Sequence, residues 1–302
     1  MTTSPSHDGI FVPAVHETLP QQIIAALAQH RMATAGQLGD LLRPDSTRQT
    51  VSRPLNRFRR EGLIEFVPLP NTRARAWFLT AEGAQLVRDP PHMRGRPASP
   101  VTSRTAASLK TAHTLTAVRT HLAFVTDARR RGDEHDYLDW TPEVAHPLGD
   151  RERLIADALM HYVLHGPDGR RTKLRCLVEV DRATTSSERL ARKLIDYARL
   201  HSYAPSRQRT RQPQLPFWQR SYPVFPRILF VLTGAKPVRL ANRIEDLRAM
   251  AAEHPLVAPF ARTVPMGAAV LEDIEEHGAT GPVWTPLHGR REDRRSWTDL
   301  RA

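Results

Sequence analysis

Cysteine is almost absent from this 302-residue chain, and that scarcity excludes domains that are stabilised by disulfides or by a cysteine-bound zinc ion. Cys176 is the single cysteine, so neither a disulfide framework nor a cysteine zinc site can form. The 14 histidines are scattered and lack the paired spacing of a zinc motif. No internal repeat is found either, which argues against a repeat architecture.

Long apolar runs are also lacking. No stretch approaches the roughly 18 apolar residues of a membrane span. The first ten residues, MTTSPSHDGI, do not show the basic-then-apolar pattern of a secretory signal. We therefore expect a cytoplasmic protein with no membrane partner.

Lysine is the third scarce residue. The chain has 44 basic residues and a net charge of +12, but its only lysines are Lys110, Lys173, Lys193 and Lys236. Such an excess of arginine indicates a polyanionic partner, most simply nucleic acid. GC-rich coding would also enrich arginine, so composition alone does not decide between these two causes.

The length is sufficient for two domains with ordinary cores. Residues 89–104, DPPHMRGRPASPVTSR, are rich in proline, arginine and serine, and they predict a linker. This places one domain at residues 19–88 and a second at residues 105–285. We expect a disordered tail at residues 1–18 and a mobile basic tail at residues 286–302.

The first domain has the pattern of a winged helix-turn-helix. Apolar residues at helical spacing predict three helices, over residues 21–31, 34–42 and 45–64. The segments IEFVPL and RAWFLT then predict two strands around PNTRA, and a closing helix follows Thr80. In this motif the third helix enters the major groove of DNA and the hairpin forms the wing.

That geometry identifies the candidate DNA-contacting residues of the third helix and the wing. They are Arg48, Gln49, Ser52, Arg53, Asn56, Arg57, Arg60, Arg73 and Arg75. A winged helix used for protein contacts, or a solvated arginine-rich face, is the alternative.

Residues 154–181 predict a β-hairpin whose register can be derived. With the turn centred on Asp168, opposed residues have numbers that sum to 336, so Asp157 faces Glu179 and Asp181 follows on the same face. The other face is apolar throughout: Ala156, Ala158, Met160, Tyr162 and Leu164 against Val180, Val178, Cys176 and Leu174. Opposed carboxylates repel, so a cation is expected between them, and a divalent metal is the natural candidate.

The helix that follows the hairpin adds a lysine. Residues 185–188, TSSE, predict a capping box, and Leu190, Leu194, Tyr197 and His201 then share a stripe with Lys193 at its edge. Metal-dependent phosphodiester cleavage needs carboxylates that hold Mg²⁺ or Mn²⁺ and a lysine that stabilises negative charge. The candidate catalytic residues are therefore Asp157, Glu179, Asp181, Lys193 and Tyr197, of which the first three are candidate metal ligands.

The acidic residues also allow two roles without a metal. In the first, they lie on a solvated sheet face and pair with Arg175, Arg182 and Arg189, since such surface pairs need no function. In the second, they are the remnant of a nuclease fold that serves only for binding. For Lys193, an aliphatic stem lying over apolar surface accounts for its position equally well.

The remaining segments complete a mixed-sheet domain of the α/β (α+β) class. A helix over residues 105–131 carries His113, which we expect to be buried and satisfied. Phe217, Trp218 and Tyr222 alternate with basic residues, so they stack either on bases or on the core. RILFVLTG predicts a buried central strand, followed by a helix over residues 239–254 and another strand within TVPMGAAVLED.

The segment LVEVDRATTSSERLARKLIDYARL resembles the signature of the replication-relaxation proteins of actinobacterial plasmids and integrative elements. ATAGQLGDLL, WFLTAEGAQLV and the HTL at His113 resemble the same family, over about residues 20–235. One departure is Ala156, where the family pattern has proline. The resemblance implies a role in plasmid replication or in relaxation of DNA for transfer.

The second domain is also similar in layout to the PD-(D/E)xK nuclease fold, with Asp157, Glu179 and Lys193 as the matching residues. It departs from that pattern at Asp181, which stands where the usual lysine would be. Lys193 on the next helix could replace that lysine, or the site could have lost catalysis.

Two functional hypotheses follow. One is a DNA-binding protein of plasmid replication, relaxation or transfer with a metal-dependent nuclease or nickase domain. The other is a non-catalytic DNA-binding accessory factor or transcriptional regulator that uses a degenerate nuclease fold for assembly. The expected partner is double-stranded DNA, with other plasmid replication or transfer proteins and a second copy of the chain as further candidates.

Overall fold

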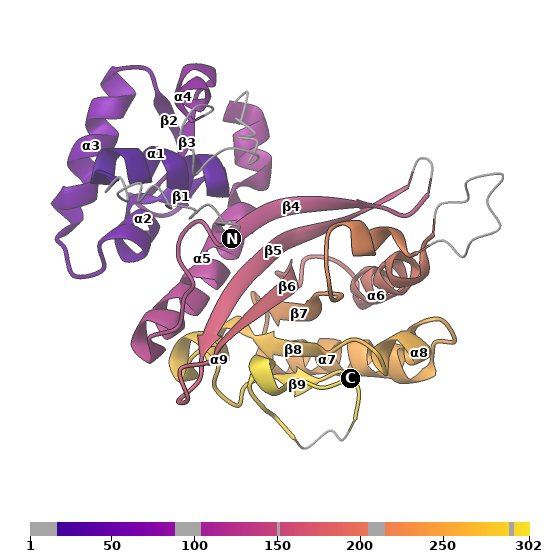
Figure 1. Ribbon diagram of the computed structural model, residues 1–302. Helices are drawn as coiled ribbons and strands as arrows, with labels where there is room; N and C mark the ends of the chain where they lie inside the picture. Colours follow the sequence, from indigo (N-terminus) through magenta and orange to yellow (C-terminus); the bar gives the residue numbers. More distant parts are fainter. Residues whose placement is uncertain (1–16, 88–103, 150–151, 205–214, 290–292) are drawn as a thin grey trace, which may run out of the picture.

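The computed structural model describes residues 17–87, 104–149, 152–204, 215–289 and 293–302. The expected tail at residues 1–18 lies almost wholly outside these ranges, as does the expected linker at residues 89–104. Two folded units are joined by the long helix α5 (Arg104–Arg131), which lies beside both of them (Figure 1). In the described residues, no helix combines the length and the apolar character needed to cross a membrane.

The N-terminal unit has the predicted order of three helices, a hairpin and a closing helix. Its elements are α1 (Leu19–His30), β1 (Ala33–Thr34), α2 (Ala35–Leu42), α3 (Arg48–Arg60), β2 (Ile64–Pro68), β3 (Arg75–Leu79) and α4 (Ala81–Leu86). Thr34 caps α2, because its hydroxyl accepts the Gln37 N–H at 3.1 Å. Thr80 caps α4 in the same way through the Gly83 N–H at 3.1 Å.

The three short strands form a sheet in the order β1-β3-β2, all antiparallel. Phe66 of β2 lies opposite Trp77 of β3. Trp77 is buried with apolar side chains of the three preceding helices, among them Ile23, Leu27, Leu38, Leu41 and Leu55. The hairpin is therefore fixed to the helices by its own aromatic side chain.

The second unit is built on a six-stranded mixed sheet in the order β4-β5-β6-β7-β8-β9. Its strands are β4 (Trp140–Pro147), β5 (Arg153–His165), β6 (Arg171–Asp181), β7 (Arg227–Leu232), β8 (Met266–Val270) and β9 (Thr285–Pro286). Strands β6, β7 and β8 are parallel to one another, and the other pairs are antiparallel. The predicted central strand is β7, and it is buried along nearly its whole length.

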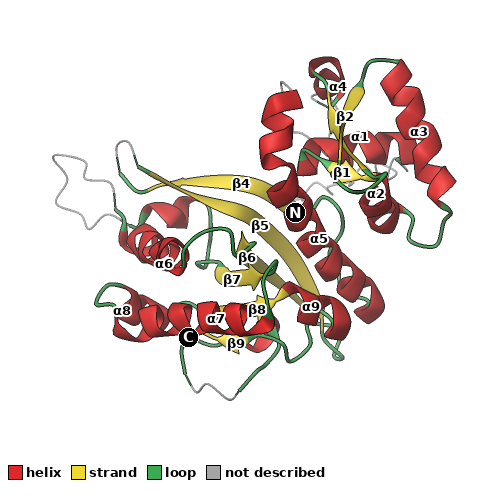
Figure 2. Ribbon diagram, turned by 180° about the vertical axis from the view of Figure 1, so that it is seen from behind, coloured by secondary structure: helices red, strands yellow, loops and turns green. Residues whose placement is uncertain are grey.

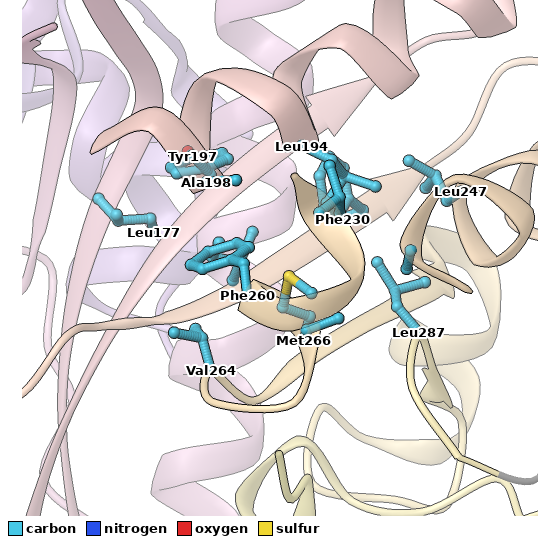
Figure 3. Close-up of a cluster of buried hydrophobic side chains, with 14 of the residues drawn as sticks. Leu177, Leu194, Tyr197, Ala198, Phe230, Leu247, Phe260, Val264, Met266 and Leu287 are labelled. Atoms are coloured by element: carbon cyan, nitrogen blue, oxygen red, sulfur yellow. The ribbon is translucent and has the colours of Figure 1, made fainter. Parts of the chain in front are cut away.

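Helices cover both faces of this sheet (Figure 2). One face carries α6 (Ser187–Ser202), α7 (Pro237–Glu253) and α8 (Val257–Ala261), and the other carries α5 and α9 (Leu271–His277). Figure 3 shows the core of the first face, where Tyr197 and Leu194 of α6 approach Leu177 and Phe230 of the sheet. A mixed sheet between two helical layers places the chain in the α/β class.

The predicted hairpin register is confirmed over residues 158–165, where Leu159 pairs with Leu177 and His161 pairs with Arg175, but the predicted pair of Asp157 with Glu179 is not part of the ladder. One detail of the predicted apolar face is wrong. Ala158 belongs to the core on the α5 side, as predicted, but Ala156 belongs to the core on the α6 side. The pairing of β5 with β6 reaches only to Ala158, opposite Val178, so Ala156 lies outside the ladder between these two strands.

The C-terminal residues were expected to be a mobile tail, but part of this segment is core. Trp297 is fully buried, and Leu300 is buried beside it in the layer under α5. Arg227 of β7 donates hydrogen bonds from Nη1 to the carbonyl oxygens of Trp297, at 3.2 Å, and Leu300, at 2.7 Å. The high basic content of the segment concealed these two apolar anchors.

A group of buried histidines lies where the two units meet. The centre of the His121 ring, on α5, lies 5.0 Å from that of His30 of α1 and 4.9 Å from that of His135. The same ring stacks on Trp140 of β4, with 5.0 Å between the ring centres. Burial lowers the pKa of His30 to about 4 and that of His135 to about 3, and it holds the pKa of His121 well below its ordinary value. All three are therefore neutral near pH 7.

Candidate functional site

Asp157 lies at an interruption of the sheet on both sides of β5. Towards β6, regular pairing reaches only to Ala158, the residue that follows Asp157. Towards β4, pairs form at Pro142 and Val144, but Glu143 between them has a φ of 49° and leaves the ladder. A non-glycine residue in this left-handed conformation is strained and occurs where the surrounding structure holds it.

Polar side chains replace the missing strand pairing. Oδ2 of Asp157 accepts the Val180 N–H at 2.8 Å, and Nζ of Lys193 donates to the carbonyl oxygen of Ile155 at 2.7 Å. Backbone groups that lose their ladder partners can be satisfied by side chains in this way. Both candidate residues therefore have a structural role in addition to any chemical one.

Glu179 is the centre of the site and is only 3% exposed. Nζ of Lys193 lies 3.1 Å from Oε1 and 3.0 Å from Oε2, and the Tyr197 hydroxyl donates to Oε1 at 2.6 Å. Lys193 and Tyr197 are four residues apart on α6, so both reach the same carboxylate. The helix begins one residue later than predicted, because Ser186 is the N-cap and accepts the Arg189 N–H.

Burial and the neighbouring Asp157 raise the pKa of Glu179 to about 7, although Lys193 and Tyr197 act in the opposite direction. Burial and the Glu179 carboxylate together raise the pKa of Tyr197 well above its usual range. Glu179 is therefore partly protonated near pH 7, and Tyr197 keeps its proton.

Asp157 behaves differently because it faces a histidine. Burial alone would raise the pKa of Asp157, but His113, the Val180 N–H and Lys193 outweigh it and hold the pKa below its ordinary value. Nε2 of His113 lies 3.4 Å from Oδ1 of Asp157, and this contact raises the pKa of His113. The His113 side chain is 46% exposed, so this histidine is not the buried core residue that was expected.

Asp181 does not join the other acids. Its Oδ2 accepts a hydrogen bond from Nε of Arg243, on α7, at 2.6 Å, and its Oδ1 accepts the Ala183 N–H at 3.1 Å. Nη1 of Arg243 continues to the carbonyl oxygen of Thr185 at 2.9 Å. This buried pair holds the loop between β6 and α6, in which Ala183 has a φ of 53°.

The structure thus brings Asp157, Glu179, Lys193 and Tyr197 together and directs Asp181 elsewhere. The solvated face does not form, since Glu179 and Asp181 are buried and their cations are Lys193 and Arg243. The arginines expected as partners in that alternative were Arg175, Arg182 and Arg189.

Two residues of the site were missed. His113 carried a signal in the HTL motif. For Arg243 the sequence signal was its helical position, because it lies on the buried stripe of α7 with Leu240, Ile244 and Leu247.

The acids of this site do not fit Mg²⁺ or Mn²⁺ as they are arranged. Five of the six carboxylate oxygens of Asp157, Glu179 and Asp181 already accept bonds from Val180, Lys193, Tyr197, Ala183 or Arg243. The sixth, Oδ1 of Asp157, faces His113. Across the described ranges, no three His, Cys, Asp or Glu side chains are grouped so as to hold a metal ion.

The predicted base-stacking loop is partly core. Trp218 and Tyr222 are buried, and the Tyr222 hydroxyl lies 2.7 Å from Nε2 of His146. Phe217 is half-buried, and Arg220 lies over its ring at 4.8 Å. The two buried aromatics therefore pack on the core, while residues 205–214 lie outside the described ranges.

A second group of candidate residues lies on α3. Val51, Leu55 and Phe58 are buried on one side of this helix, and its other side carries exposed arginines. The candidate residues on α3 and the wing are exposed, with Ser52 half-buried: Arg48, Gln49, Ser52, Arg53, Asn56, Arg57, Arg60, Arg73 and Arg75. Arg57 is paired with Glu61 at 2.8 Å, and no acid lies within α3 itself.

Comparison with known proteins identifies the family of this chain. No curated protein and no solved structure matches this chain. The family model described as replication-relaxation matches residues 24–214, which is more than half of the chain and includes α3, the hairpin and the site around Glu179. The chain belongs to the replication-relaxation family.

Proposed function

We propose that this chain is a DNA-binding protein of plasmid replication or DNA relaxation, whose N-terminal unit is a winged helix that binds duplex DNA. The observation that carries the proposal is the exposed side of α3, which holds five arginines and no acidic residue. The hairpin β2–β3 follows directly and adds exposed Arg73 and Arg75 near the turn. Exposed cations on one helix and an adjacent hairpin, most of them without an acid partner among the described residues, fit the phosphates on both sides of a major groove.

The amphipathic division of α3 supports this assignment. The apolar side of α3 is buried in the core, whereas Arg48, Arg53 and Arg60 are exposed and have no packing role. None of the three has a carboxylate within 4.0 Å among the described residues. Four arginines of this helix have no acid partner among the described residues and repel one another, and a polyanion relieves that repulsion, so the pattern favours a nucleic acid.

The second unit serves assembly or support in this proposal. We infer that it is a PD-(D/E)xK-like domain without catalysis, because Asp181 stands in place of the usual lysine and is bound to Arg243. The remaining acids, Asp157 and Glu179, are held by the Val180 N–H, His113, Lys193 and Tyr197. The accessory role therefore fits the described contacts better than a nuclease role does.

The test is the salt dependence of binding to a labelled DNA duplex. Each lost phosphate contact lowers the slope of log K against log salt by about 0.9, so Arg48→Gln/Arg53→Gln/Arg60→Gln should lower it by up to about 2.7. A control variant with the same change in net charge carries glutamine at the exposed Arg192, Arg262 and Arg301 of the second unit. Equal slopes for the two triple variants would refute the assignment of α3.

A metal-dependent nuclease is the second candidate, and one observation favours it. Asp157, Glu179 and Lys193 meet where β5 parts from β6, and these residue types are the ones that phosphodiester cleavage uses. A metal would require Lys193 to leave Glu179. Calorimetric titration of Mn²⁺ into wild type and Glu179→Ala, followed by a plasmid nicking assay, decides: nicking that both Asp157→Ala and Glu179→Ala abolish would establish this function over the accessory role.

A further inference from the structure

Phe66 of β2 connects the helix α3 to the wing. The guanidinium carbon of Arg59, in the last turn of α3, lies 4.7 Å from the centre of the Phe66 ring. The guanidinium carbon of Arg75, at the start of β3, lies 4.3 Å from the same centre. Phe66 also meets the buried Trp77 edge-on at 5.2 Å, which ties the ring to the core.

Both arginines retain their full charge for a ligand. Arg59 and Arg75 are exposed, and neither forms an ion pair with any acid in the ranges the structure describes. Arg57, two residues before Arg59, is instead paired with Glu61. The two charge centres are separated by at most the sum of their distances to the ring, about 9 Å, so they repel unless an anion lies between or beside them.

The geometry of stacking leaves the donors available. A guanidinium uses its flat face on an aromatic ring and its N–H edge for hydrogen bonds, so stacking and phosphate binding do not compete. An arginine held by a ring also loses less side-chain entropy when it binds. Phe66 therefore orients two cations from different elements before a ligand arrives.

We propose that Arg59 and Arg75, held on Phe66, form a binding site for backbone phosphate of duplex DNA, with Phe66 as a positioning residue. The inference rests on the proposed DNA binding and deepens it. It adds Arg59, which the sequence pattern did not single out. In this proposal, the site also fixes how α3 and the wing are oriented relative to each other on the duplex. Phosphate is the ligand class because each guanidinium group can donate two parallel hydrogen bonds to its oxygens.

The test is a mutant cycle read by fluorescence anisotropy with a labelled duplex at several salt concentrations. Arg59→Gln and Arg75→Gln should each weaken binding several-fold and each lower the salt slope by about 0.9. Phe66→Leu should weaken binding several-fold in wild type and have no effect in Arg59→Gln/Arg75→Gln. In the control background Arg73→Gln, where the wing arginine contacts no ring, Phe66→Leu should keep its full effect. Phe66→Tyr, which keeps the ring, should restore wild-type affinity.

The outcomes separate this inference from the proposal on which it rests. Wild-type binding that depends on Arg48, Arg53 and Arg60 but not on Arg59 or Arg75 overturns only the phosphate site. The same holds if Phe66→Leu costs as much in the double-arginine background as in wild type. Absence of duplex binding by wild type overturns both. The two single arginine variants change exposed positions, so their salt slopes decide the matter even if Phe66→Leu fails to fold.

Discussion

The protonation of Glu179 can be tested through protein stability. Its carboxyl group is buried, and its pKa is raised from 4.5 to about 7 by burial and by Asp157. A group whose pKa is raised by folding contributes stability that is present below 4.5 and is lost as the pH rises through about 7. At 1.36 kcal/mol per pH unit, this interval corresponds to about 3 kcal/mol.

Glu179→Gln removes this titration while keeping the shape of the side chain. We expect the free energy of unfolding of wild type, relative to Glu179→Gln, to fall by about 3 kcal/mol between pH 4.5 and 7 and to stay constant above it. Urea denaturation at a series of pH values measures this difference. The control Glu188→Gln changes an exposed acid on the same helix and should leave the wild-type pH profile in place.

A constant difference between wild type and Glu179→Gln at all pH values would refute the reasoning. It would mean that the 3.0 Å contact with Lys193 keeps Glu179 ionised in the folded protein despite its burial. That result would also strengthen the nuclease candidate, because an ionised carboxylate is the form that binds a metal.

Three further predictions concern stability. Lys193→Met should lower the free energy of unfolding by about 3 kcal/mol, because Glu179 loses its cation and the Ile155 carbonyl its donor; urea denaturation measures this loss. Arg243→Met should lower the free energy of unfolding by about 3 to 5 kcal/mol, because it leaves Asp181 buried and unpaired. The control Arg239→Met removes one hydrogen bond to the Ala183 carbonyl and should lower it by about 1 kcal/mol. A loss for Arg243→Met no greater than that for Arg239→Met would contradict the role of the Arg243–Asp181 pair. The buried His30 has a folded pKa of about 4, below its ordinary 6.5, so its contribution is present above pH 6.5 and about 3 kcal/mol is lost as the pH falls to 4; denaturation of His30→Gln and wild type across this range should show that difference, and parallel curves would contradict it.

Much of the fold was predictable because its signals are local. The hairpin register followed from the turn at Asp168 and the alternation of apolar residues, and it was correct over residues 158–165. The buried run of β7 was equally direct. Each of these features depends on residues close together in the sequence.

The candidate site depended on contacts that no local pattern contains. His113 of α5 meets Asp157 of β5, and Asp181 at the end of β6 meets Arg243 of α7, although the two residues of each pair are far apart in the sequence. Ala156 lies outside the β5–β6 ladder and packs in the core on the α6 side of the sheet. Trp297 was missed because its ring packs on Phe124 and Tyr162, which lie far away in the sequence.

Helix α3 and the wing together form the proposed DNA-binding surface. Hydrogen exchange of the full chain with and without a DNA duplex can check this assignment, because it reports contacts segment by segment. We expect duplex DNA to slow exchange in α3 and in the β2–β3 hairpin while α6, which carries Lys193 and Tyr197, is unchanged. Protection confined to α6 and the neighbouring strands β5 and β6, with α3 unaffected, would contradict the assignment.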